Sequence, residues 1–168
     1  MKLKLWQVDA FSEKALGGNP AAIVPLSAWI DDALMQKIAN ENNLAETAFF
    51  VKTAPGKYAL RWFTPAAEVE LCGHATLASA WLLFNTLDPE LRTVSFETRS
   101  GTLTVDRGRD ERHVMRLPSD LIAPLQVDGL AAEIGEALGS APPTELFKGR
   151  YLVAVWDDAA HVRNLEGP

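Results

Sequence analysis

The chain has 168 residues, of which 48% are hydrophobic, enough to bury the core of one ordinary domain, or of one lobe with the opening of another. Its 16 lysines and arginines stand against 22 aspartates and glutamates, and the net charge of -6 would repel a phosphate backbone. These numbers argue against a disordered or fibrous protein and against nucleic acid as a partner.

The sequence shows no export or membrane signal. The first residues lack the continuous apolar run of about 7–15 residues that a secretory signal needs. The longest apolar stretch, residues 75–84, is far shorter than the ~20 residues that cross a bilayer. Cys72 is the single cysteine, which excludes an intrachain disulfide and fits a reducing compartment. We therefore predict a cytoplasmic protein without a membrane partner.

The first part of the chain predicts several strands and one helix. Gly17-Gly18-Asn19-Pro20 cannot continue regular structure and is expected to form a tight loop. Ser27 is expected to cap an amphipathic helix that runs to about residue 40. Alternating side chains and a turn signal at residues 54–56 predict the strands of this region, at residues 2–9, 21–24, 47–51 and 57–63.

A helix with apolar side chains nearly all round is predicted over residues 73–85, and such a helix belongs at the centre of a core. Strands follow, separated by turn signals that include a solvated turn at residues 107–112. The elements predicted after the helix are strands 93–98, 102–106, 112–117 and 150–156 and helices 130–138 and 157–165. We predict a domain over residues 1–118, then a linker and the beginning of a second unit over residues 119–168.

Glu46 is the leading candidate for acid–base chemistry. It lies among small and apolar side chains where the chain passes from a helix to a strand. Partial desolvation at such a place favours the neutral carboxyl group, which a general acid needs. The alternative interpretation is a glutamate at a strand edge that faces water, as most glutamates do.

A second candidate lies at the start of the apolar helix, in Leu71-Cys72-Gly73-His74-Ala75-Thr76. Unpaired backbone N–H groups at a helix start can hold a carboxylate or an oxyanion, and Gly73 would allow a close approach. His74 could add a proton or a hydrogen bond. The alternative is a structural helix start with a buried thiol. A Cys-x-His pair also suits a metal, but no second ligand pair follows at a useful spacing, so no metal is predicted.

Six motifs in order resemble the N-terminal lobe of the phenazine-biosynthesis PhzF-like isomerase family. They are Val8-Asp9-Ala10-Phe11, Gly18-Asn19-Pro20-Ala21, Asn43-Leu44-Ala45-Glu46-Thr47-Ala48-Phe49, Arg61-Trp62-Phe63-Thr64-Pro65, Glu70-Leu71-Cys72-Gly73-His74-Ala75-Thr76 and Thr98-Arg99-Ser100-Gly101. The resemblance implies an α+β, diaminopimelate epimerase-like fold of two pseudo-symmetric lobes. Each lobe would be an antiparallel β-barrel-like sheet around a central helix, here residues 73–84.

The resemblance also implies a cofactor-independent isomerase in which Glu46 moves a proton between carbons of a small carboxylated substrate. His74 would share in catalysis, and Asn19, Gly73, Ala75 and Thr76 would bind the substrate. Cys72 lies where related epimerases place a catalytic thiol, but the phenazine enzyme itself does not rely on one, so its role is open. No organic cofactor is implied.

The chain departs from the family in its second lobe. The Glu-Asp-Pro-x-Thr-Gly-Ser-like motif, which completes the family's cleft, does not occur in these 168 residues. We therefore expect an incomplete second lobe and activity only in a two-lobed form. The alternatives are a binding or scaffold lobe without catalysis, and a cysteine-dependent epimerase assembled from two chains. Apolar surface left uncovered would favour homo-oligomers.

Overall fold

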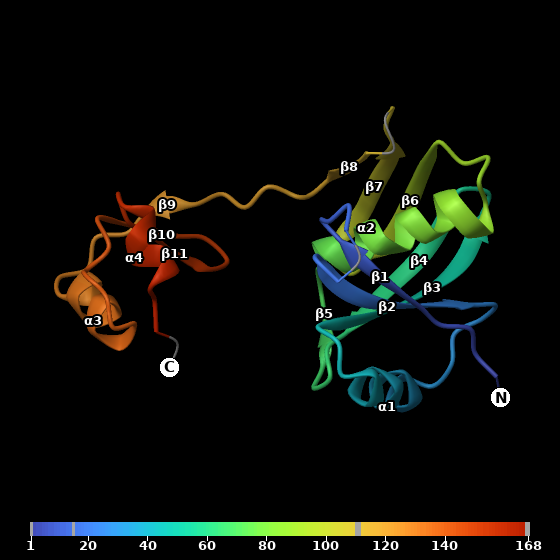
Figure 1. Cartoon of the computed structure of the whole chain (residues 1–168), viewed down its shortest axis with the longest axis horizontal. Helices are drawn as coiled ribbons and strands as arrows, with labels where there is room; N and C mark the ends of the chain where they lie inside the picture. The colour runs from blue at the N-terminus through green and yellow to red at the C-terminus, as the bar shows by residue number, and fades with distance from the viewer. Residues whose placement is uncertain (1, 15, 110–111, 167–168) are drawn as a thin grey trace. The chain divides into compact units, whose positions relative to one another are not determined.

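The computed structural model describes residues 2–14, 16–109 and 112–166. Its contacts divide the chain into two units, Met1–Leu117 and Pro118–Pro168, one residue before the boundary predicted from the sequence. Each unit is described by itself (Figure 1). The turn predicted at residues 107–112 includes residues 110–111, which lie outside the described part of the chain.

Eight strands form the sheet of the first unit: β1 (Trp6–Ala10), β2 (Asn19–Leu26), β3 (Glu46–Ala54), β4 (Lys57–Phe63), β5 (Glu68–Val69), β6 (Thr93–Thr98), β7 (Gly101–Arg107) and β8 (His113–Arg116). The strand order is β1-β2-β3-β4-β6-β7-β8, and β5 pairs with β4.

The sheet is mixed, and the prediction of an antiparallel sheet is therefore wrong in this detail. Strands β2 and β3 pair in parallel, as do β4 and β6, whereas the other neighbours are antiparallel. Parallel neighbours cannot be joined by a tight turn and need a crossover connection, commonly a helix. Both crossovers in this unit contain one: α1 (Asp32–Asn42) joins β2 to β3, and α2 (Gly73–Leu82) lies between β4 and β6.

The sheet curls around α2, which contacts β1, β2, β3 and β8 (Figure 1). Most of this helix is buried, and a π-helical turn, η1 (Leu83–Leu87), continues it. The two elements together cover the predicted helix at residues 73–85. The main core lies between α2 and the sheet, and its largest buried side chains include Trp62, Phe84, Phe96, Ile23, Leu60, Leu82 and Leu103.

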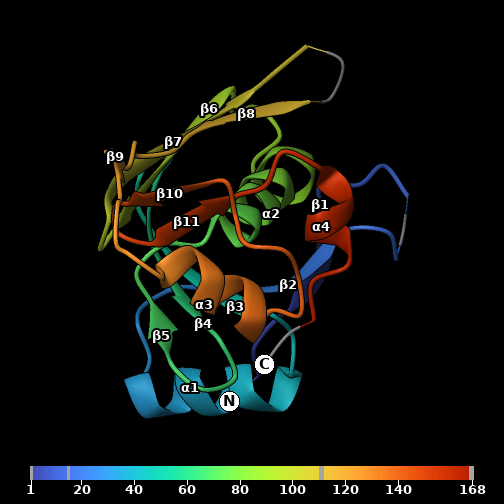
Figure 2. The same cartoon turned by 90° about the vertical axis from the view of Figure 1, so that its left-hand side faces the viewer.

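Helix α1 packs on the other face of the sheet, over β3 and β4 (Figure 2). A second cluster fills this interface, formed by Val24, Leu26, Met35, Ala39, Phe49 and Phe63. The predicted cap, Ser27, is wrong: the residue that precedes the helix is Asp31, whose carboxylate accepts a hydrogen bond from the Leu34 N–H at 3.2 Å. Residues 27–31 have no helical structure, so Ser27 lies too far from the first helical turn.

The second unit contains a small antiparallel sheet and two helices. Its elements are β9 (Ala123–Pro124), α3 (Leu130–Ala137), β10 (Glu145–Lys148), β11 (Leu152–Val155) and α4 (Ala159–Arg163), with the strand order β11-β10-β9. Strand β10 was not predicted from the sequence. Among the described residues of the whole chain, none of the helices combines the length and apolar character needed to cross a bilayer.

Candidate active site

Glu46 begins β3, directly after the chain leaves α1. Asn43 ends the helix in the left-handed conformation, with φ 49° and ψ 37°, and its N–H donates to the Ala39 carbonyl. Asparagine tolerates this conformation better than most residues, and it turns the chain back toward the sheet. Side chains alternate along β3, so Glu46 shares the face of Ala48 and Phe50, which belong to the core beneath α2. Glu46 therefore points toward α2.

The parallel register with β2 fixes the position of Glu46 along the sheet. Ala21 of β2 is its partner in the sheet, and Ala21 itself has no exposed surface. The side chain of Glu46 retains 19% exposure, so one part of it remains reachable from solvent. The interpretation of Glu46 as a fully solvated strand-edge residue does not fit this position.

Cys72 and His74 lie at the start of α2. Cys72 has an extended backbone, with φ -143° and ψ 111°, and precedes the first helical residue. The Thr76 hydroxyl donates to the Cys72 carbonyl at 2.6 Å and fixes this first turn. His74 is one residue into the helix and only 8% exposed, because its ring enters the space between α2 and the sheet.

The structure brings Glu46, Cys72 and His74 together. His74 Nε2 lies 3.2 Å from Glu46 Oε2, and His74 Nδ1 lies 3.4 Å from Cys72 Sγ. Although Nε2 and Oε2 are close enough for an ion pair, neither forms a well-aligned hydrogen bond with the part of the chain that the structure describes, and both atoms are buried. A buried donor and acceptor left in this state favour binding of a polar ligand group. The imidazole thus lies between a thiol and a carboxylate.

The thiol of Cys72 is held in its neutral form. Burial raises its pKa to about 12, and the nearby charge of Glu46 acts in the same direction. Backbone N–H groups of Ala75 and His74 approach the sulfur and oppose this rise. The neutral thiol is a poor nucleophile and a poor base near neutral pH, because the thiolate is the reactive form.

The other predicted site residues lie near this cluster. Asn19 is exposed at the start of β2, two residues before the partner of Glu46. Gly73 is partly exposed, and a Cβ there would meet Met115 Cε at 3.5 Å, which is ordinary contact. Ala75 and Thr76 have no exposed surface. The backbone N–H and the side-chain hydroxyl of Thr76 both donate to the Cys72 carbonyl. A direct contact of this side chain with a ligand would therefore require the turn to change.

Glu46, Cys72 and His74 also form a group of three potential metal ligands. One ligand atom from each lies within 4.8 Å of the others, and the mixed donor set of sulfur, nitrogen and oxygen is one that zinc accepts. However, His74 directs a different ring nitrogen to each neighbour, Nε2 to Glu46 and Nδ1 to Cys72. A single ion bound by all three would require the ring to turn and the thiol to lose its proton. The arrangement fits a proton-sharing cluster better than a metal site.

Charged residues outside this cluster hold the segment that leads into Cys72. Glu68 of β5 bonds to Arg61 of β4, and Arg99 in the β6–β7 turn bonds to the same carboxylate at 2.7 Å. The Ser100 hydroxyl donates to the Glu70 carbonyl at 2.8 Å. Arg61 and Ser100 belong to two of the six family motifs, but no role was predicted for either residue from the sequence. Their function in the fold is to fix residues 68–71, immediately before the site.

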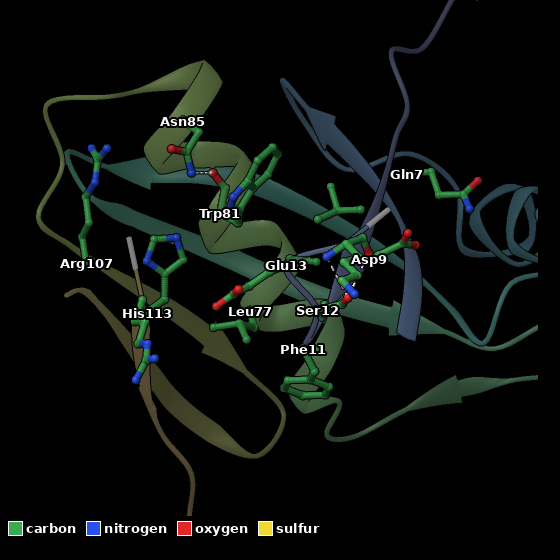
Figure 3. A pocket seen from close by; sticks show the side chains of 15 residues that line it. Gln7, Asp9, Phe11, Ser12, Glu13, Leu77, Trp81, Asn85, Arg107 and His113 are labelled. Carbon is green, nitrogen blue, oxygen red and sulfur yellow. Dashed lines mark hydrogen bonds between the residues drawn. The ribbon is translucent and has the colours of Figure 1, made fainter. Parts of the chain in front are cut away.

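A cavity of about 940 Å³ lies along α2 beyond the helix start, beside Leu77 and Trp81. Figure 3 shows Trp81 of α2 and Asn85 of η1 on one side, with His113 and the segment around Ser12 also lining the space. None of the site residues predicted from the sequence lines it. The cavity and the Glu46–His74 pair are therefore separate features of the first unit.

Solved structures share this fold. A PhzF-family phenazine biosynthesis protein of Enterococcus faecalis is 40% identical, with a TM-score of 0.82 over 99% of this chain and 62% of that chain. A hydroxyproline epimerase of Agrobacterium vitis is 13% identical, with a TM-score of 0.58 over 96% of this chain and 52% of that chain, and shows the fold alone. The curled sheet around a central helix therefore defines a protein with an epimerase-like fold.

The sequence comparisons place the chain within this class. The family described as phenazine biosynthesis-like protein, PhzC-PhzF, matches residues 8–124, and the chain belongs to it. An uncharacterised isomerase of Pseudomonas aeruginosa is 50% identical over 159 residues, which are 94% of this chain and 59% of that protein. The human phenazine biosynthesis-like domain-containing protein is 48% identical over 117 residues, 66% of this chain and 41% of that protein. The chain thus spans about three fifths of the most similar of these relatives.

Proposed function

We propose that this chain supplies one lobe, and the acid–base residue Glu46, of a cofactor-independent isomerase that moves a proton between carbons of a small carboxylated substrate. The observation that carries the proposal is the contact of 3.2 Å between Glu46 Oε2 and His74 Nε2, two buried atoms without aligned hydrogen bonds. Relatives named as isomerases support the reaction class. The chemistry proposed needs neither a metal nor an organic cofactor.

Glu46 accepts a proton from one carbon of the substrate and returns it to another carbon. The carboxylate that removes the proton becomes a neutral carboxyl group, which then acts as the acid, so charge and protons balance over the two steps. A single residue can do this only when both carbons lie on its side of the substrate. His74, beside Glu46, donates a hydrogen bond to the substrate and helps to fix its orientation.

We propose that the substrate carboxylate binds near the start of α2. A helix N-terminus favours negative charge, and Gly73 allows an approach that a larger side chain would obstruct. Asn19, exposed at the same end of the sheet, offers an amide group as a further contact. The Thr76 N–H already bonds to the Cys72 carbonyl, so Gly73 is the more suitable donor of the two.

Cys72 is not the base in this proposal. A thiol whose pKa is about 12 is almost wholly protonated near neutral pH, whereas a general base needs a pKa closer to the working pH. This argues against a cysteine-dependent epimerase assembled from two chains. It also leaves Glu46 as the titratable group of the cluster best suited to accept a proton from carbon.

The proposal includes a role for a second lobe. Proton transfer between carbons needs a substrate held from both sides, since orientation contributes several kcal/mol, on the order of 7–11 in favourable cases. We therefore expect the 168-residue chain to be nearly inactive by itself. We further propose that it self-associates through Tyr151, Leu152 and Val153, which are 71%, 50% and 38% exposed. Light scattering would report a monodisperse monomer if this were wrong.

Exchange of substrate hydrogen with deuterium from solvent tests the acid–base role. A two-lobed protein can be made by joining this chain to the remaining part of the 50%-identical relative. Small unsaturated and amino-substituted carboxylates are incubated with it in D₂O, and deuterium at carbon is measured by mass spectrometry. We expect Glu46→Gln to lower the exchange rate at least about 100-fold, within the range that acid–base catalysis contributes.

Glu97→Gln is the matched control, because Glu97 is an exposed carboxylate on β6. It should keep the exchange rate of the unchanged protein. Exchange that persists in Glu46→Gln at the rate of this control would show that Glu46 is not the acid–base residue. If the chain alone binds such carboxylates but no two-lobed form exchanges deuterium, the alternative of a binding lobe without catalysis is the better account.

A further inference from the structure

The thiol of Cys72 has one hydrogen to donate and a restricted set of acceptors. The residue is only 6% exposed, so its partners come mainly from the protein itself. Its sulfur faces the backbone N–H groups of His74 and Ala75 at the start of α2, which are donors and not acceptors. The S–H must therefore turn toward the side chains of the cluster, where His74 Nδ1 lies 3.4 Å from the sulfur.

A neutral imidazole has one nitrogen that donates and one that accepts. If Nδ1 accepts the S–H, then Nε2 carries the hydrogen. Nε2 is the nitrogen that faces Glu46 Oε2 at 3.2 Å. With the opposite tautomer, the lone pair of Nε2 would face a carboxylate oxygen at that distance, which is repulsive while Glu46 is ionised. The Nε2–H tautomer satisfies both neighbours at once.

The position of the two residues makes this relationship rigid. Cys72 precedes α2 and His74 is its second residue, and the Thr76 hydroxyl fixes the Cys72 carbonyl at 2.6 Å. The backbone positions from which the thiol and the ring extend are therefore fixed relative to each other. Among the described residues, Nε2 forms no aligned hydrogen bond, and its nearest acceptor is Glu46 Oε2 at 3.2 Å. The hydrogen on Nε2 therefore lies on the side of the ring that faces the Glu46 carboxylate.

We propose that Cys72 is a positioning residue, whose S–H holds His74 as the neutral Nε2–H tautomer so that His74 presents a hydrogen-bond donor beside Glu46. The proposal rests on the proposed function in that this donor is directed at the substrate. It gives the single cysteine a role that requires neither a thiolate nor a second thiol. Glu46 is the competing acceptor for the same hydrogen, because the three groups all lie within 4.8 Å.

Nitrogen-15 NMR of the histidine side chains tests the tautomer in the 168-residue chain. The chain has three histidines, so the His74 signals can be assigned with His161→Gln and His74→Gln variants. At neutral pH we expect the unchanged chain to show His74 with hydrogen on Nε2 and an acceptor signal for Nδ1. In Cys72→Ala the ratio of the Nε2–H form to the Nδ1–H form should fall roughly five-fold. This is the change in equilibrium expected from the loss of one ordinary hydrogen bond.

Cys72→Ser is the matched variant, since its hydroxyl keeps a donor at the same place. We expect it to retain the Nε2–H form, and a backbone spectrum close to that of the unchanged chain shows that both variants fold. Hydrogen on Nδ1, a doubly protonated ring in the unchanged chain, or a ratio that Cys72→Ala leaves the same would overturn the proposal. Because this readout involves no turnover, its failure is distinct from a failure of Glu46 in the deuterium-exchange assay.

Discussion

Arg61 donates two hydrogen bonds to Glu68, from Nε to Oε1 at 2.7 Å and from Nη2 to Oε2 at 2.8 Å. The same guanidinium bonds to Asp32 of α1 and lies 5.5 Å from the ring centre of Trp29. One side chain thereby joins α1, β4 and the short strand that precedes Cys72. Its planar fork is required for this, because an ammonium group cannot pair with two carboxylates in the same geometry.

We expect Arg61→Lys to lower the free energy of unfolding by roughly 1–2 kcal/mol, through the loss of charge-assisted hydrogen bonds at a side chain that is only 18% exposed. Arg116→Lys is the control, because Arg116 pairs with Asp106 on the surface with 70% of its side chain exposed. Such pairs contribute little. Urea unfolding followed by fluorescence compares the two, and equal losses would contradict the structural role of Arg61.

The raised pKa of Cys72 predicts a loss of stability in alkali. Its ordinary value is 9.0 and its value in the folded chain is about 12. Between these values the unfolded thiol ionises while the folded thiol keeps its proton, so the folded state binds more protons and stability falls as pH rises. The contribution of the thiol to the free energy of unfolding is fully present below about pH 9. It declines as the pH rises toward 12, by at most about 1.4 kcal/mol per pH unit.

Cys72→Ala isolates this effect. Burial also raises the pKa of Tyr58, which contributes a decline of the same sign in both proteins. The difference between the unchanged chain and Cys72→Ala should therefore shrink with rising pH, measured as unfolding free energies from pH 8 to pH 11. Parallel pH profiles for the two proteins would show that the thiol is not held neutral by the fold.

Gly18 lies where the chain enters β2, and its position leaves no space for a side chain. A Cβ at this residue would collide with the carbonyl oxygen of Ala10, a backbone atom that cannot move away independently. We expect Gly18→Ala to destabilise the chain by about 1–3 kcal/mol, the usual range for overpacking. At Gly17 the nearest atom is Ser12 Oγ at 3.0 Å, a side-chain atom that can turn, so Gly17→Ala should cost less. Thermal unfolding of both variants decides this.

Phe96 is fully buried in the core beneath α2, with its ring centre 6.4 Å from that of Phe50. Phe96→Ala is expected to lower the free energy of unfolding by about 3–5 kcal/mol, since the removed ring leaves a cavity. Phe11→Ala removes the same ring from a residue that is 70% exposed and should change stability by no more than about 0.5 kcal/mol. A small effect of Phe96→Ala would mean that this core does not determine stability.

Local patterns predicted several elements well. The strands at residues 57–63 and 93–98 agree with β4 and β6 at both ends, because alternation and turn residues act over neighbouring positions. The two-residue strand β5 is too short to show a period of two. The cap of α1 was misplaced because Ser27 and Asp31 are both good capping residues, and the chain between them decides which one meets the helix.

Antiparallel pairs joined by turns, such as β3 with β4, follow from these local patterns, but the parallel partners of the strands could not be predicted from them. Whether β3 pairs with β2 in parallel depends on where α1 carries the chain, which alternation does not encode. The same holds for the site: Glu46 and His74 lie on different elements and meet only through the register of β3 and the docking of α2. The sequence singled out both residues by their surroundings and by family resemblance, and the thiol contact of His74 was not foreseen.

The crossover through α1 also bears on the order of events as the chain folds. The hairpin of β6 and β7 joins neighbouring segments and can form early, whereas the pairing of Ala21 with Glu46 must first close the loop that contains all of α1. We therefore expect Glu46 to reach His74 only after the slower, long-range part of the sheet has assembled. The site thus forms only when the parallel pairing of β2 and β3 is complete. A folding intermediate without this pairing would contain secondary structure but would lack the contact between the Glu46 carboxylate and the His74 imidazole.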